Sequence, residues 1–116
     1  MHSVAETPEF LRAAKRVGID DAERAELVST IASHPTAGEI MVGTGGLRKF
    51  RHARPGVGKS GGYRVCTYYY SDNYPVFLIT VFAKNQKANL TEAERNSVAA
   101  FLRELIVQYA RGKSGK

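Results

Sequence analysis

The chain is poor in several residue types, and their scarcity narrows its function. Its 116 residues include one cysteine, Cys66, no tryptophan and three histidines. A single cysteine excludes an internal disulfide and a cysteine-based zinc site. The histidines are scattered, and no His, Asp or Glu cluster has the spacing of metal ligands. We therefore expect neither a metal ion nor any other cofactor.

Long apolar runs are absent as well. No stretch approaches the roughly 20 apolar residues of a membrane span, and the first residues lack an apolar run of signal-peptide length. An apolar fraction of 43% and a charged fraction of 24% are typical of a globular protein. We expect one domain over residues 1–116, with about 111–116 as a flexible tail. The expected location is the cytoplasm, without membrane contact.

Acidic residues are missing from one long segment. Residues 43–70 hold six Lys and Arg residues, seven glycines and no Asp or Glu. Residues 40–91 hold eight basic residues and one acidic residue, whereas residues 1–39 hold four basic and seven acidic residues. Because like charges repel, so basic a segment is costly unless its partner is a polyanion. The pattern favours nucleic-acid binding; a solvated basic face that aids solubility is the alternative.

Capping signals predict two helices in the acidic N-terminal part. The Thr-Pro pair at residues 7–8 predicts an N-cap followed by a helix that runs to about Val17. Asp20 and Glu23 have the spacing of a capping box, and the helix that follows ends near His34.

After residue 39 the helical pattern gives way to short runs rich in β-branched and aromatic residues. Glycines or polar turns separate these runs, which cover residues 39–43, 47–53, 63–70 and 76–83. They predict an antiparallel sheet of about four strands, with a mobile glycine loop at residues 54–62. Thr91 and Glu94 then begin a C-terminal helix, which runs to about Ala110. The fold class is α+β.

Residues of the third run combine positive charge with aromatic rings. Because alternate residues of a strand share a face, Arg64 points to the same side as Tyr68 and Tyr70. Lys84 ends the next run and lies near Arg64 across the predicted hairpin. Such a surface suits single-stranded RNA, since cations bind phosphates and aromatic rings stack on bases. Packing within the core or the sheet is the alternative role for each tyrosine.

Three motifs together resemble a known protein family. They read GGLRK, GKSGGYRV and AKNQKANLT. With the helical GIDDAERAEL they resemble the HigB branch of the RelE superfamily, the toxin ribonucleases of bacterial toxin–antitoxin pairs. The resemblance implies an α+β microbial-ribonuclease fold, and ribosome-dependent cleavage of mRNA in the ribosomal A site that arrests translation. It also implies a cognate antitoxin, for which we expect a helix-turn-helix protein.

The resemblance implies roles for individual residues. Arg64 matches the arginine that such toxins place at the scissile phosphate, and Lys84 lies near the position of a second basic residue. Lys59 or Lys84 is a candidate general base, with Tyr68 as a weaker one, because adjacent cations lower the pKa values of lysine and tyrosine. The expected RNA-binding residues are Arg48, Lys49, Arg51, His52, Arg54 and Lys87.

Two features of relatives have no counterpart here. Many relatives carry a catalytic tyrosine shortly after the last strand, where this chain reads KANLTEAE, and there is no histidine after His52. Cleavage by the 2′-hydroxyl of RNA needs a base, cations that stabilise the phosphorane, and an acid for the leaving oxygen. The residues that transfer protons stay unassigned, so we expect ribosomal positioning of the mRNA to supply much of the rate.

Two other functions would use the same basic surface: a noncatalytic RNA- or ribosome-binding module, and a basic protein-interaction subunit. Translation arrest on expression would separate them from the ribonuclease. For the antitoxin, the uneven charge predicts contact with the acidic N-terminal helices or the adjoining sheet edge, which would keep the complex out of the A site.

Overall fold

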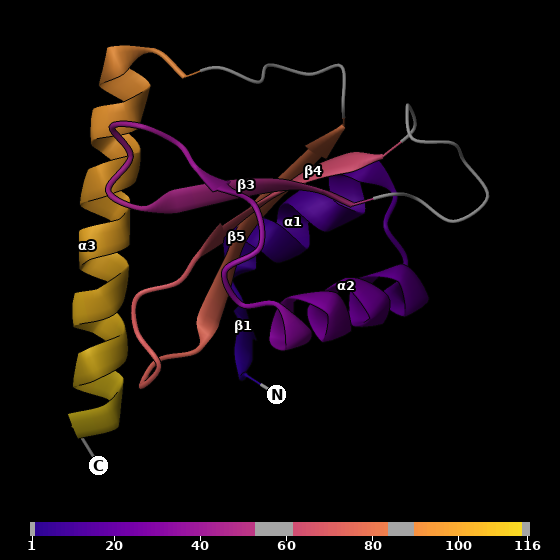
Figure 1. The fold of residues 1–116 in the computed structure, drawn as a ribbon, viewed down its shortest axis with the longest axis horizontal. Helices are drawn as coiled ribbons and strands as arrows, with labels where there is room; N and C mark the ends of the chain where they lie inside the picture. The colour runs from indigo at the N-terminus through magenta and orange to yellow at the C-terminus, as the bar shows by residue number, and fades with distance from the viewer. Residues whose placement is uncertain (1, 53–61, 84–89, 115–116) are drawn as a thin grey trace.

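A computed structural model describes residues 2–52, 62–83 and 90–114. These residues form helices around one sheet (Figure 1). The chain order is β1 (Val4–Glu6), α1 (Pro8–Val17), α2 (Asp21–Ser33), β2 (Glu39–Ile40), β3 (Leu47–His52), β4 (Tyr63–Tyr68), β5 (Val76–Ala83) and α3 (Glu92–Ser114). The predicted α+β class is confirmed.

The sheet is mixed and has five strands in the order β1-β5-β4-β3-β2. Strands β2 to β5 correspond to the four predicted runs, and their pairings are antiparallel. Strand β1 is an addition that the sequence analysis does not predict; it pairs in parallel with Val76–Leu78 of β5. A three-residue strand carries too short a pattern to be recognised, and its partner lies far along the chain.

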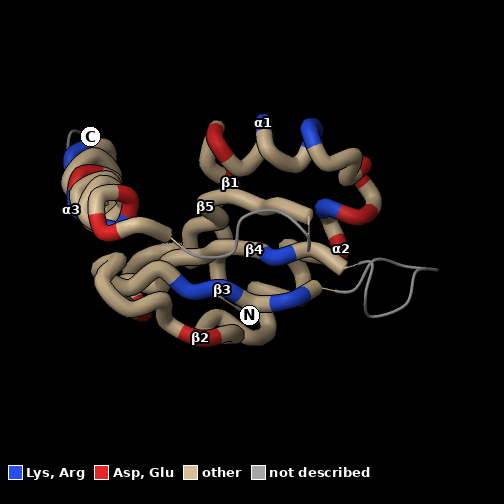
Figure 2. Tube along the Cα trace, turned by 90° about the horizontal axis from the view of Figure 1, so that it is seen from above, with Lys and Arg blue, Asp and Glu red and all other residues tan. Residues whose placement is uncertain are grey.

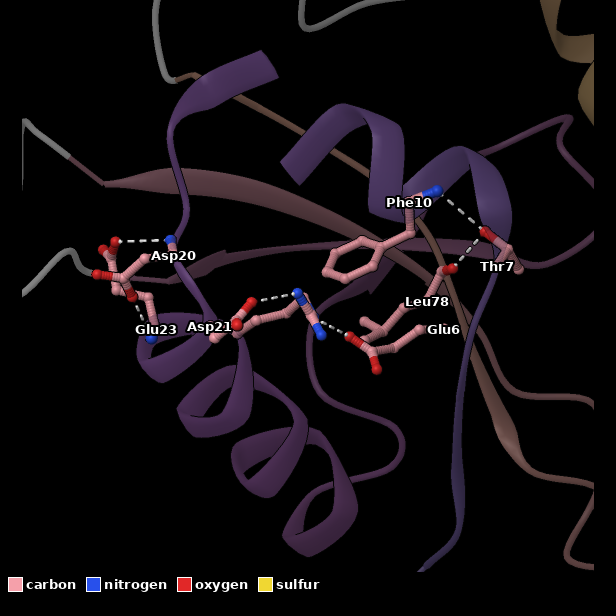
Figure 3. Close-up of polar contacts among 8 residues, drawn as sticks. Glu6, Thr7, Phe10, Asp20, Asp21, Glu23 and Leu78 are labelled. Carbon is pink, nitrogen blue, oxygen red and sulfur yellow. Dashed lines mark hydrogen bonds and ion pairs between the residues drawn. The ribbon is translucent and has the colours of Figure 1, made fainter. Parts of the chain in front are cut away.

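Thr7 joins the first helix to the sheet. Its Oγ1 accepts a hydrogen bond from the Phe10 N–H at 3.1 Å and donates to the Leu78 carbonyl at 2.8 Å (Figure 3). Gly18 ends α1 in the left-handed conformation, with φ of 84°. Both predicted ends of this helix are therefore confirmed.

The second helix begins with the predicted capping box. The Glu23 N–H donates to Asp20 Oδ1 at 2.8 Å, and Glu23 Oε1 accepts from the Asp20 N–H at 3.3 Å (Figure 3). One turn later, Arg24 Nε lies 2.7 Å from Glu6 Oε2, an ion pair that links α2 to β1. The capping box of Thr91 and Glu94 is also present. Helix α3 continues to Ser114, past its predicted end.

The sheet buries a different cluster on each face. Helices α1 and α2 cover one face, where Phe10, Leu27 and Ile31 pack against Val65 and Leu78. Helix α3 covers the other face through Leu102 and its neighbours, which pack against Leu47, Cys66, Tyr68 and Phe77. Figure 1 shows α3 standing apart from α1 and α2, with the strands between them.

A bulge in β5 brings two phenylalanines to the α3 face. Cys66 lies opposite Thr80 but Thr67 lies opposite Leu78, so Ile79 is an extra residue in the ladder. Strict alternation would place Phe77 and Phe82 on opposite faces. Because of the bulge, both belong to the cluster under α3.

We expect Thr7→Ala to lower the free energy of unfolding by about 1–2 kcal/mol, because it removes the α1 cap and a buried hydrogen bond to β5. Urea denaturation followed by circular dichroism measures the loss. Thr7→Ser retains the hydroxyl and is the matched control, for which we expect a clearly smaller loss. Equal losses in the two variants would contradict the role of the hydroxyl.

Candidate functional site

Basic residues of β3 and β4 gather on the face that α3 packs against. Arg51 lies directly opposite Arg64, and Lys49 lies opposite Cys66. Directly opposite residues point to the same face, with Cβ atoms about 4.5–5.5 Å apart. Cys66 belongs to the α3 cluster, so all three basic residues share its face. Figure 2 shows the basic segments of β3 and β4 side by side. We call Lys49, Arg51 and Arg64 the basic face.

One nitrogen of the Arg64 guanidinium lacks a hydrogen-bond partner among the described residues. This nitrogen, Nη1, is also buried. A buried donor without a partner costs free energy, and the cost is larger for a charged group. The like charge of Arg51, directly opposite, adds repulsion. The arrangement therefore favours an anion in front of these two strands.

A cleft of about 790 Å³ separates the N-terminal half of α3 from the sheet. On the sheet side it is lined by Cys66, Thr80 and Phe82, and on the helix side by Ser97 and Phe101, among others. Phe82 lies opposite Arg64 in the ladder, and Cys66 follows Arg64 on the same face. Two neighbours of Arg64 on its face therefore line the cleft, whose volume lies in the range of small-molecule sites.

Arg48 and His52 point away from the basic face. Arg48 Nη1 donates to the Thr36 carbonyl at 3.1 Å, in the loop after α2. His52 Nε2 lies 3.8 Å from Glu26 Oε1, on α2. The structure therefore does not bring these two expected RNA-binding residues together with Lys49 and Arg51. The pleat of β3 separates neighbours in the sequence onto opposite faces.

Tyr68 lies on the Arg64 face but is buried under α3, with 9% of its surface exposed. Burial, with a smaller contribution from the charge of Tyr70, raises the pKa of Tyr68 above its ordinary value of 10.0. This corrects the expectation that cations lower its pKa. Four residues of strand place Tyr68 roughly 13 Å from Arg64. Its phenol is poorly suited to act as a general base.

The remaining predicted site residues, Arg54, Lys59, Lys84 and Lys87, lie outside the described residues. Within the described ranges, no three His, Cys, Asp or Glu side chains gather as metal ligands. None of the helices in that part of the chain has the length and apolarity needed to cross a membrane.

Several residues that line the cleft escaped the sequence analysis. Thr80 and Phe82 lie in a run that is apolar on both faces, so alternation does not single them out. Ser97 and Phe101 belong to α3, and no local pattern indicates that their helix turn faces β5. Only the packing of α3 brings these residues together around the cleft.

A family model described as the RelE toxin of the RelE/RelB toxin–antitoxin system matches residues 3–115. The chain belongs to the RelE toxin family. RelE toxins are generally mRNA-cleaving endoribonucleases, and membership implies an antitoxin partner. The match confirms the RelE part of the resemblance and does not distinguish the HigB branch.

The buried thiol of this RelE toxin gives a pH-dependent stability. Burial raises the pKa of Cys66 from 9.0 to about 11, and the ammonium of Lys49 opposes the rise in part. As the pH rises, the thiol of the unfolded chain ionises before the buried thiol of the folded protein. The stability gained by keeping the buried thiol protonated is therefore complete below pH 9 and is lost as the pH rises to about 11. We expect the free energy of unfolding, relative to Cys66→Ala, to fall by about 2 kcal/mol between pH 8 and pH 11.

Urea denaturation of both proteins across this pH range measures the difference. Lysine and tyrosine titrations affect both proteins and cancel in the comparison. Parallel pH curves for the two proteins would contradict the assignment.

Proposed function

We propose that this RelE toxin is a ribosome-dependent mRNA endoribonuclease of the HigB type, which arrests translation in the cytoplasm. The observation that carries the proposal is the buried Nη1 of Arg64, which has no partner in the described ranges, on a face shared with Lys49 and Arg51. A phosphate group of mRNA would accept the missing hydrogen bond. It would also neutralise the repulsion between Arg64 and Arg51, and a guanidinium matches phosphate oxygens well.

The proposed reaction is attack of the 2′-hydroxyl of RNA on the adjacent phosphorus, with departure of the 5′-oxygen. In this proposal Arg64 stabilises the dianionic phosphorane, because a fixed positive charge beside the scissile phosphate favours the negative charge that develops there. The adjoining cleft accepts a nucleotide, whose base packs against the apolar lining that includes Phe82.

The predicted candidates for the general base are Lys59, Lys84 and Tyr68, and the Cys66 thiol is a further ionisable group on the same face. The raised pKa values of Cys66 and Tyr68 keep both protonated at neutral pH, so neither is proposed as the general base. We propose Lys59 or Lys84, in which neighbouring cations would favour the neutral amine. A lysine is a weak substitute for a dedicated acid–base pair. Orientation of the mRNA in the A site would therefore supply much of the rate.

The RNA-binding set is narrower than the sequence alone suggested. Lys49 and Arg51 share the face of Arg64 and are proposed to hold phosphates beside the scissile one. Arg54 and Lys87 stay proposed RNA contacts. Arg48 holds the loop after α2, and His52 faces α2, so we leave both out of the interface.

We expect cleavage of mRNA on translating ribosomes, with cuts in the A-site codon, and far slower cleavage of the same RNA without ribosomes. Primer extension on both substrates measures the positions and rates. Equally fast cleavage of naked RNA would contradict the ribosome dependence. Binding to RNA or ribosomes without any cleavage would favour the noncatalytic module instead.

We expect Arg64→Met to reduce the cleavage rate by roughly 10²- to 10³-fold, by analogy with the loss of one donor to a developing oxyanion. The same change should leave the free energy of unfolding equal or higher, because it removes a charged group whose Nη1 is buried without a partner among the described residues. Single-turnover cleavage and urea denaturation measure the two effects.

The matched control is Arg103→Met, on an exposed position of α3. We expect it to retain both the activity and the stability of the wild type. A stable Arg64→Met protein with undiminished cleavage would remove Arg64 from the mechanism.

A further inference from the structure

Two large apolar side chains project from the outer edge of the sheet. Val42 is 87% exposed and Ile40 is 54% exposed, and they flank Met41, which packs into the α3 cluster. Val42 is the most exposed large apolar residue in the described ranges. Strand β2 is the last strand on this side and pairs with β3 through two residues. These side chains contribute little to the core.

The turn that carries Val42 is firmly built. Thr44 is fully buried, and its Oγ1 donates to the Met41 carbonyl at 2.6 Å and accepts from the Leu47 N–H at 3.0 Å. Gly43, with φ of 82°, lies so close to the Arg95 side chain that a Cβ atom would come within 2.8 Å of it. The turn therefore holds Val42 outward through defined contacts with α3.

A hollow of about 370 Å³ lies beside these apolar residues. Lys49 and Arg95 line it together with one acid, Glu39, so the lining has a net positive charge. Met41 lines both this hollow and the cleft beside Arg64, so the two are neighbours. We call Ile40, Val42 and this hollow the β2-edge surface.

We propose that the β2-edge surface docks the antitoxin, through a segment that combines an apolar side chain with carboxylates. Valine and isoleucine offer nothing to a phosphate, so the exposed apolar pair fits a protein better than RNA. The net positive hollow complements an acidic segment. Family membership supplies the partner.

Docking here has a consequence for activity. Lys49 lines the hollow and also belongs to the basic face, so a bound segment covers part of the surface that mRNA would occupy. The antitoxin would then inhibit by excluding RNA as well as by adding bulk. This consequence rests on the proposed function, whereas the docking itself rests on the β2-edge surface and on the existence of an antitoxin.

The test is the affinity of purified toxin for the antitoxin encoded with it, measured by titration calorimetry in the absence of RNA. We expect Val42→Asp to raise the Kd at least tenfold, or about 1.4 kcal/mol. Ile40→Asp is a second, independent variant with the same expected direction. Val107→Asp, at a valine of α3 that is 43% exposed, is the matched control and should change the Kd less than twofold. The wild-type affinity should also fall as salt rises.

An unchanged Kd in both edge variants would overturn the proposal. Impaired cleavage on ribosomes with unchanged antitoxin affinity would also overturn it, and would assign this surface to the ribosome. Cleavage by the free toxin is measured separately and should be unaffected by Val42→Asp. Because the antitoxin titration contains no RNA, failure of the docking proposal is distinguishable from failure of the proposed ribonuclease activity.

Discussion

The site depends on a single register of β4 against both of its neighbours. Strand β4 alternates between the two clusters, so that Tyr63 and Val65 pack toward α1 and α2 while Arg64 and Cys66 lie on the α3 side. A slip of one residue would bury the Arg64 guanidinium in the apolar cluster under α1. The free-energy cost of desolvating the guanidinium in that cluster favours the observed register over the slipped one. The same register sets Arg64 opposite both Arg51 and Phe82.

Ion pairs among the described residues hold several carboxylates of the N-terminal segment beside arginines of the same segment. Glu9 forms ion pairs with Arg12 and Arg16, and Arg24 binds Glu6 and Asp21. Most of these pairs are exposed and contribute little stability each. Their effect is to keep the carboxylates near the N-terminal helices. Arg64 Nη1 stays without a partner among the described residues, and a local cost of this kind is expected at functional sites.

The cleft follows from the way α3 is attached. Near its C-terminal end, the ring of Tyr109 contacts those of Tyr74 and Phe77, with centroids 5.3 and 5.6 Å apart. Near its N-terminal end, Arg95 packs against the turn at Gly43 and donates to the Leu90 carbonyl. Between these attachments the helix leaves space above Cys66 and Thr80. A helix held at both ends keeps the walls of the cleft in place.

Local patterns in the sequence were enough to predict the helix starts and the faces of the longer strands, because capping and alternation depend on residues a few positions apart. Thr7, Asp20 and the side shared by Arg64 and Tyr68 were predicted in this way. The uneven charge, which also needs no tertiary contact to be recognised, indicated a polyanionic partner.

Which of the predicted residues lie together depended instead on how distant segments pack. That packing added β1, separated His52 from Arg51, and buried Tyr68 under α3, so that desolvation raises a pKa that cations were expected to lower. It also left Arg64 Nη1 without a partner in the described ranges and exposed Val42 at the sheet edge. Desolvation and edge exposure arise only when segments far apart in the chain meet, so no local pattern encodes them.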